Sequence, residues 1–235
     1  VGTMREDLTQ ALHEASETRS VRAIVITGAG RGFSAGGDID FMQDLQERKE
    51  ILEFTALLSA GASIVTKIRD IPQPVIASVN GVAAGAGLNL ALACDMRIAS
   101  ETARFSASFV KIGLHPDWGG TYFLPRLVGA SRAMELMMTG RLIEADEAWQ
   151  IGLVDRVVPH ERLMEVTTKL AKAIAYGPPI AIQNLKRAVY ESENNELRMQ
   201  IRLETENQIR AFVSSDATEG LKAFREKRKP RFRGE

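Results

Sequence analysis

The sequence predicts an α/β fold followed by a helical C-terminal region. Strand-like and helix-like segments alternate over residues 1–160, whereas the pattern over residues 161–226 is helical with few strand signals. A chain of 235 residues is long enough for one domain with a large buried core. We therefore expect an α/β core over residues 1–160 and a helical region over residues 161–235.

The first half of the core is predicted from periodicity and from residues that start or stop helices. Apolar residues recur at helical spacing over residues 3–18, and β-branched residues predict a buried strand over 21–27. Asp38 can cap a short helix that runs to position 45. Prolines at positions 72 and 74 end a long helix over 51–68.

The second half repeats this alternation in shorter elements. The expected strands cover residues 75–79, 96–99, 104–106 and 154–158, and the expected helices cover 86–93, 119–127, 130–139 and 145–150. Breaks at residues 177–179 and 214–216 divide the helical region that follows. No internal repeat or low-complexity tract is present.

Composition bears on partners and on location. Thirty basic and thirty acidic residues balance, which does not suggest a nucleic acid or a membrane as partner. The longest apolar runs are far shorter than a membrane span. A single cysteine, Cys94, fits a reducing compartment, so we expect a cytoplasmic protein, although a targeting segment upstream of residue 1 would not be visible. The three histidines lack the spacing of metal ligands, so no metal is expected.

Two glycine-rich turns, each directly after an apolar strand, are the most informative feature of the chain. The first covers residues 28–37 and the second residues 80–89. Small side chains let a ligand approach the backbone, where free N–H groups can point at it. Two such turns can aim two N–H groups at one oxygen, which is the geometry of an oxyanion hole.

Two other interpretations of the first turn are weaker. Gly28 and Gly30 begin a dinucleotide-binding pattern, but Phe33 occupies the third glycine position, where a bulky ring prevents close helix–strand packing. Residues 32–36 match the serine-hydrolase pattern G-x-S-x-G around Ser34, with Asp117 or Asp155 and then His160 downstream. That pattern needs a strand directly before the serine and a helix directly after it, and glycines separate Ser34 from both.

Both turns, with several downstream segments in order, give the chain a family resemblance. These segments are residues 24–28, 33–39, 74–81, 84–87, 94–99, 113–120 and 224–228. The chain resembles the enoyl-CoA hydratase/isomerase (crotonase) superfamily over nearly its whole length, without the N-terminal strand pair usual there. The resemblance implies the ClpP/crotonase-like fold, a spiral of ββα repeats with a C-terminal helical trimerisation region. It also implies a homotrimer or dimer of trimers, an acyl-CoA substrate, and no cofactor apart from the coenzyme A of the substrate.

The resemblance places the two oxyanion donors on the backbone N–H groups of Gly37 and Ala86. Ala86 opens an expected helix, so its N–H is one of the unpaired donors of the first turn. The chain departs from the family pattern at the two glutamates of the hydratases. Asn89 and Phe109 stand at those positions, and neither side chain can act as a base at neutral pH. Addition of water by a pair of glutamates is therefore not expected.

One acid remains at a position that carries an aspartate base or nucleophile in some branches of the superfamily. Asp117 lies between Pro116 and Trp118, which can desolvate the carboxylate and raise its pKa. The alternative is that Asp117 only caps the helix expected from residue 119. A single base suits double-bond isomerisation, because one carboxylate can remove a proton and return it two carbons away.

Other activities stay open at this point. They are enoyl-CoA hydration by a route without glutamates, acyl-CoA hydrolysis, and acyl-CoA binding without catalysis. We expect the following residues to contact the substrate or its coenzyme A part, mainly from the resemblance: Ala35, Asp38, Ile39, Gly85, Asn89, Phe109, Trp118, Phe224 and Lys227.

Overall fold

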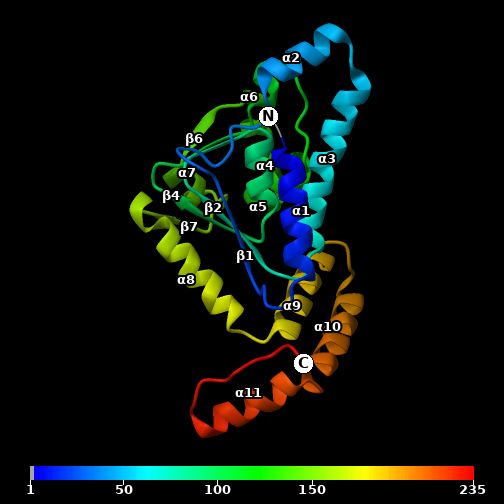
Figure 1. Cartoon of the computed structure of the whole chain (residues 1–235), viewed down its shortest axis with the longest axis vertical. Helices are drawn as coiled ribbons and strands as arrows, with labels where there is room; N and C mark the ends of the chain where they lie inside the picture. Colours follow the sequence, from blue (N-terminus) through cyan, green and yellow to red (C-terminus); the bar gives the residue numbers. More distant parts are fainter. Residues whose placement is uncertain (1–2) are drawn as a thin grey trace.

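The computed structural model describes residues 3–235 and shows an α/β core with helices projecting from one end (Figure 1). The strands are β1 (Ile24–Thr27), β2 (Val75–Val79), β3 (Val82–Ala84), β4 (Met96–Ser100), β5 (Arg104–Ser106), β6 (Leu142–Glu144) and β7 (Arg156–Val158). The helices are α1 (Met4–Glu17), α2 (Ile39–Arg48), α3 (Ile51–Asp70), α4 (Ala86–Ala93), η1 (Ser108–Ile112), α5 (Gly120–Val128), α6 (Ala130–Thr139), α7 (Ala145–Gln150), η2 (His160–Arg162), α8 (Leu163–Ala175), α9 (Pro179–Glu191), α10 (Leu197–Phe212) and α11 (Ser215–Glu226).

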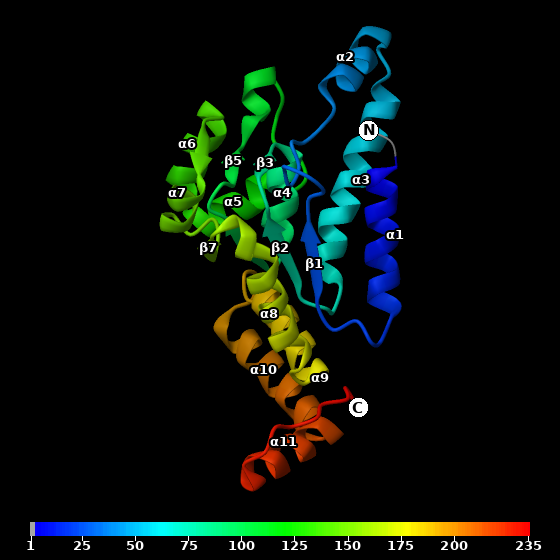
Figure 2. The ribbon, with the colours of Figure 1, turned by 60° about the vertical axis from the view of Figure 1, so that its left-hand side comes forward.

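Two small sheets form the core. The first is parallel, with strand order β1-β2-β4-β7, and the second has the order β3-β5-β6, with β3 and β5 parallel and β6 antiparallel. Because β2 and β3 are separated by only two residues, the chain passes directly from one sheet into the other at the second glycine-rich turn. Figure 2 shows α1 and α3 side by side along the edge of the fold that β1 occupies.

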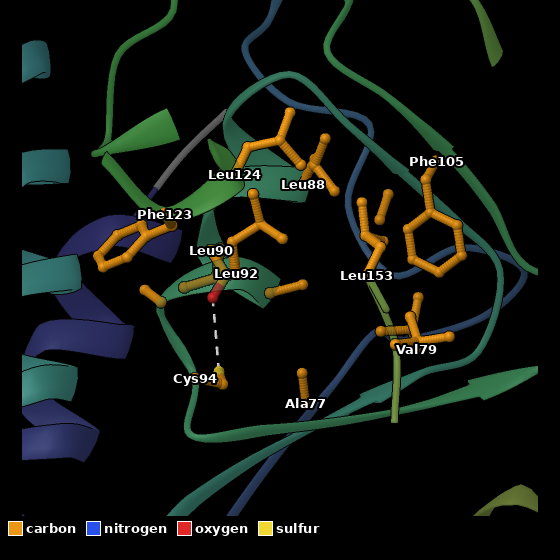
Figure 3. Packing of buried hydrophobic residues seen from close by; sticks show 14 of the residues in the cluster. Ala77, Val79, Leu88, Leu90, Leu92, Cys94, Phe105, Phe123, Leu124 and Leu153 are labelled. Carbon is orange, nitrogen blue, oxygen red and sulfur yellow. Dashed lines mark hydrogen bonds between the residues drawn. The ribbon is translucent and has the colours of Figure 1, made fainter. Parts of the chain in front are cut away.

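Helix α4 occupies the centre of the core (Figure 3). Its last seven residues are all buried, and Leu88, Leu90 and Leu92 pack with Val79, Phe105 and Leu153. A helix that is apolar on every side is stable only when other elements enclose it. Enclosure fixes the N-terminus of α4, and with it Ala86, against the rest of the fold.

Most predicted elements are confirmed, and the differences have local causes. The strand expected over residues 21–27 begins at Ile24, because Val21 closes a turn by donating its N–H to the Thr18 carbonyl. Strands β3 and β6 were not predicted, because β3 lies inside the second glycine-rich turn and β6 lies in the short connection between α6 and α7. The expected breaks at residues 177–179 and 214–216 separate α8 from α9 and α10 from α11.

Helix α3 corrects the expectation that no segment of the chain is long and apolar enough to span a membrane. By length and composition alone it could cross a membrane, with a mean hydropathy of 1.5 over its most apolar window. Serine, threonine and glycine residues interrupt its apolar runs, so no single run is long, while they lower the mean hydropathy little. In this fold α3 packs against α1, α2 and α4, and one such helix is weak evidence for a membrane protein.

The helices after residue 161 divide into two groups. Leu163 of α8 packs with Ile76 and Ile98 of the parallel sheet, so α8 covers the core directly. Helices α10 and α11 project away from the core (Figures 1 and 2). This part of the chain leaves large apolar side chains exposed. These exposed side chains include Leu197, Phe212, Val213 and Phe224.

A buried ion pair fastens α9 to the core. The Lys186 ammonium lies 2.9 Å from the Asp95 carboxylate, with side-chain exposures of 7% and 12%. The same ammonium donates to the carbonyls of Ile68 and Gln73, and Tyr190 of α9 donates its hydroxyl to Asp95. The pair thus joins α9 to the end of α3 and the start of β2.

Candidate active site

A cavity of about 250 Å³ lies where the two glycine-rich turns meet the beginnings of α1 and α4, helix α3 and the segment that follows η1. Its polar lining includes Asp117 and the backbone around Gly37 and Ala86, and much of the remaining wall is apolar. The structure therefore brings the three predicted catalytic positions to one cavity.

Backbone contacts fix the first turn against the second. Ser34 pairs with Ala83 as an isolated parallel bridge, and the Ala84 N–H donates to the Ser34 carbonyl at 2.9 Å. A Cβ on Gly87 would lie 2.2 Å from the Ser34 oxygen, and one on Gly36 would lie 2.9 Å from the Ala84 oxygen. Only glycine fits at these two positions, because the two turns approach each other so closely.

Two N–H groups at this junction have no protein acceptor. Among residues 3–235, no hydrogen bond is donated by the N–H of Gly37 or of Ala86. Ala86 is the first residue of α4, after Gly85 at a φ of 54°. Its N–H therefore lies at the positive end of the helix dipole, where an anionic or polarised oxygen is stabilised.

The Asp117 carboxylate is partly buried, and one of its two oxygens lacks a partner. Its Oδ1 atom is buried and makes no hydrogen bond within the described chain. Burial raises the pKa of the Asp117 carboxyl above the usual value, and the opposing effects of its own backbone N–H and of His115 are smaller. The side chain does not cap α5, because the N-cap is Gly119 and no side chain bonds there. Capping, the alternative weighed from the sequence, is therefore wrong.

Asn89 lies behind Asp117 rather than in the cavity lining. It is 2% exposed and donates from Nδ2 to the Asp117 carbonyl oxygen at 2.8 Å. A Cβ on Gly120 would lie 2.5 Å from this amide, so the contact is tight. Asn89 thus holds the Asp117 main chain in position, a role that the sequence could not reveal because the partners are 28 residues apart.

Most of the other residues expected to contact substrate do line the cavity. Ala35, Asp38, Ile39, Gly85, Phe109 and Trp118 are all in its wall. Asp38 also accepts the Phe41 N–H at 3.0 Å and so caps α2, as predicted. Trp118 adopts a φ of 47°, and its indole occupies the space beside Gly61 of α3.

Two expected contacts are not made within one chain. Phe224 and Lys227 lie at the end of α11, Phe224 is 86% exposed, and neither lines the cavity. Sequence reasoning also missed part of the wall, namely Met4 and Arg5 of α1 and Phe54, Leu57 and Leu58 of α3. No local signal marks these residues, because they reach the cavity only through the packing of α1 on α3.

The structure does not assemble the serine-hydrolase triad. His160 pairs through Nδ1 with Ser100, and Asp155 accepts the Arg97 N–H at 2.6 Å, whereas Ser34 contacts neither. Within residues 3–235 there is also no cluster of three or more His, Cys, Asp or Glu side chains that could hold a metal ion.

Two unpaired N–H groups and a partly buried carboxylate around a largely apolar cavity suit a particular class of enzyme, one that holds an oxyanion while moving a proton beside it. Residues 2–235 match the family described as enoyl-CoA hydratase/isomerase. The chain belongs to this family, also called the crotonase family, and it has the crotonase fold.

Relatives and solved structures of this family match the chain over nearly its whole length. The chain is 38% identical to a 1,2-epoxyphenylacetyl-CoA isomerase of Escherichia coli, covering 98% of this chain and 88% of that protein. It is 42% identical to a probable enoyl-CoA hydratase of Rhodobacter capsulatus, over 98% of this chain and 88% of the relative. The crystal structure of an enoyl-CoA hydratase from Bacillus anthracis superposes with a TM-score of 0.95 at 36% identity, covering 100% of this chain and 90% of that one.

Proposed function

We propose that this protein isomerises the double bond of an enoyl-CoA, with Asp117 as the base and the N–H groups of Gly37 and Ala86 as the oxyanion hole. The observation that carries the proposal is the position of the partly buried Asp117 carboxylate, with one unpaired oxygen, in the same cavity as two unpaired N–H groups. Asn89 and Phe109, which stand where a hydratase of this family has its glutamates, cannot supply a second acid or base.

The reaction follows from these positions. The thioester oxygen accepts hydrogen bonds from the N–H groups of Gly37 and Ala86, which makes the adjacent carbon more acidic. Asp117 removes a proton from C2 of a 3-enoyl thioester, and the electron pair moves into an enolate held by the two donors. The same carboxyl returns the proton to C4, which leaves a 2-enoyl thioester and regenerates the carboxylate. The raised pKa of Asp117 makes it a stronger base than an ordinary aspartate.

The names of the relatives support both this reaction and its main competitor. One relative is named an epoxyphenylacetyl-CoA isomerase and another a trans-2-decenoyl-[acyl-carrier-protein] isomerase, whereas others are named hydratases. Hydration without glutamates is therefore the second candidate, with Asp117 activating water. Hydrolysis and binding without turnover remain as further alternatives that the same experiment separates.

Assembly would complete the coenzyme A site. If Phe224 and Lys227 contact the nucleotide as the resemblance implies, a second copy of the chain must supply them, because neither lines the cavity of its own chain. The exposed apolar side chains of α10 and α11 offer a surface for that contact. We therefore propose a trimer or a dimer of trimers. With its one free cysteine, the chain is suited to a reducing compartment, and we propose the cytoplasm.

The test compares wild type with Asp117→Asn on trans-3-enoyl-CoA and on trans-2-enoyl-CoA, followed by absorbance and mass. We expect wild type to convert the 3-enoyl to the 2-enoyl thioester with no change in mass. Asp117→Asn should lower the rate roughly 10²- to 10⁴-fold, the usual contribution of a general base. Asp146→Asn is the matched control, since Asp146 is exposed on α7 far along the chain from the cavity lining, and it should retain full activity.

Three other outcomes would each indicate a different function. A gain of one water on the 2-enoyl thioester, without isomerisation, would make the protein a hydratase. Release of free coenzyme A would make it a hydrolase. Tight binding of both thioesters without turnover would leave a binding protein.

A further inference from the structure

A second pocket, of about 670 Å³, lies between α2, the start of α3 and the end of η1, next to the active-site cavity. We call it the outer pocket. Within residues 3–235, the two walls have five residues in common, namely Ile39, Met42, Phe54, Ile112 and Leu114. All five are apolar, so the junction between the active-site cavity and the outer pocket is lined by hydrocarbon and thioether groups.

Met42 places this junction beside one of the two oxyanion donors. A Cβ on Gly37 would lie 3.1 Å from Met42 Cε and 3.4 Å from its Sδ, so the end of the Met42 side chain lies beside Gly37. Met42 thus connects the Gly37 donor with the wall of the outer pocket. A methionine side chain is unbranched and flexible, so it can move aside when a ligand passes it.

The chemistry of the outer pocket favours an uncharged apolar ligand. Ile39, Ile51 and Ile112, from three different elements, line it and are exposed although apolar. Exposed apolar side chains that gather around one hollow are typical of a binding surface. The ionisable residues in its lining are one lysine and two glutamates, which do not favour the phosphates of coenzyme A.

Size and position identify the acyl chain of the substrate as the occupant. The active-site cavity, at about 250 Å³, is smaller than the roughly 300–1,000 Å³ of most small-molecule sites, so it leaves room for only a short acyl group. The outer pocket supplies adjoining apolar space. It lies around α2, at the opposite end of the molecule from α10 and α11, so it is separate from the apolar surface proposed for assembly (Figures 1 and 2).

We propose that a long acyl chain continues past Met42 into the outer pocket, so that the enzyme binds medium- and long-chain acyl thioesters more tightly than short-chain ones. This proposal rests on the proposed function only in requiring that an acyl-CoA binds with its thioester at Gly37 and Ala86. A fully buried methylene group strengthens binding about fourfold. Because the outer pocket is partly open, we expect a gain of about twofold for each methylene that enters it.

The test measures the binding of saturated thioesters, which cannot be isomerised, so its result is independent of the isomerase assay. Isothermal titration calorimetry compares butanoyl-, hexanoyl-, octanoyl-, decanoyl- and dodecanoyl-CoA below their micelle concentrations. We expect wild type to bind dodecanoyl-CoA roughly 30- to 100-fold more tightly than hexanoyl-CoA. Ile51→Asp places a charge in the wall of the outer pocket but not in that of the active-site cavity. It should weaken dodecanoyl-CoA roughly tenfold and change butanoyl-CoA little.

Leu52→Asp is the matched control, because Leu52 follows Ile51 in the first turn of α3 but lines neither the cavity nor the outer pocket. Both side chains are largely exposed, at 72% for Ile51 and 85% for Leu52, and an aspartate in the first turn of a helix is favourable at either position. Leu52→Asp should therefore fold like Ile51→Asp and keep the wild-type dependence on chain length.

Four results would overturn the proposal. Wild type could bind every chain length equally, or the two aspartate variants could weaken dodecanoyl-CoA equally. Ile51→Asp could weaken all the thioesters and free coenzyme A alike, in which case the outer pocket holds the coenzyme A part. Finally, Ile51→Asp could change the oligomeric state in analytical ultracentrifugation without changing the chain-length preference, in which case a second copy of the chain covers the outer pocket.

Discussion

Replacing Asp117 by asparagine should make the protein more stable while it removes the proposed base. The Oδ1 atom of Asp117 is buried without a hydrogen bond, so the folded state leaves an anionic oxygen poorly solvated. An unmatched buried polar atom costs about 1–3 kcal/mol. Asparagine keeps one unmatched oxygen but removes the charge, so we expect a gain near the lower end, about 1 kcal/mol. For a chain of this length, that corresponds to a rise in Tm of roughly 2–4 °C.

The gain should depend on pH in a defined direction. Burial raises the pKa of Asp117 in the folded state, so the folded protein binds this proton more tightly than the unfolded chain does. The stabilisation from that proton is fully present below the ordinary aspartate pKa of about 3.9 and is lost as the pH rises through the folded-state pKa. The difference between Asp117→Asn and wild type should therefore be full at neutral pH and shrink as the pH falls toward about 4.

Thermal unfolding followed by circular dichroism, at neutral and at mildly acidic pH, measures both effects. Asp146→Asn, which changes an exposed carboxylate, should shift the free energy of unfolding by less than about 0.5 kcal/mol at either pH. If Asp117→Asn is instead less stable than wild type at neutral pH, the carboxylate supports the fold and the reasoning from its unpaired oxygen is refuted.

Two further substitutions test other parts of the structure. Gly87→Ala places a methyl group 2.2 Å from a backbone oxygen of the first turn, so it should abolish turnover and cost about 1–3 kcal/mol. Gly32→Ala, whose Cβ would meet nothing closer than 3.7 Å, serves as its control, and equal losses would contradict the argument. Lys186→Met leaves the buried carboxylate of Asp95 without its ammonium and should lower the free energy of unfolding by about 3–5 kcal/mol in denaturant titrations. The exposed Lys169→Met should change it little, and a neutral Lys186→Met would show that the pair is not needed.

The long elements could be predicted because their signals are local. The periodic apolar residues of α1 and α3, the N-cap of α2 and the β-branched run of β2 each lie within one element. The three-residue strands β3 and β6 have no such signal and exist because neighbouring strands pair with them. Local sequence thus predicts strands that are separate apolar segments, such as β2, and it misses short strands that lie within a turn or a short connection.

The residues of the candidate site likewise divide into those that the sequence predicted and those that only the fold reveals. Gly37, Ala86 and Asp117 lie on turns whose glycines and prolines are visible in the sequence, and the family resemblance gave them roles. The amide of Asn89 contacts Asp117 across packed elements, and only the fold shows this contact and the presence of Arg5 in the cavity wall. Phe224 and Lys227 illustrate the converse, because a resemblance assigned them contacts that one folded chain does not make.

Three unfavourable features lie around this cavity. Three non-glycine residues in the described chain have positive φ, and two of them, Lys49 and Lys227, end helices, where that conformation is common. Trp118 is the third, and a bulky residue in this region carries a cost of order 1–3 kcal/mol. It stands next to Asp117, with its unpaired oxygen, and shares a cavity with Arg5, with its unpaired nitrogen. A fold selected only for stability would remove all three costs by single substitutions. Their presence in one cavity is what a binding site requires, because groups that are satisfied within the protein have nothing left to offer a ligand.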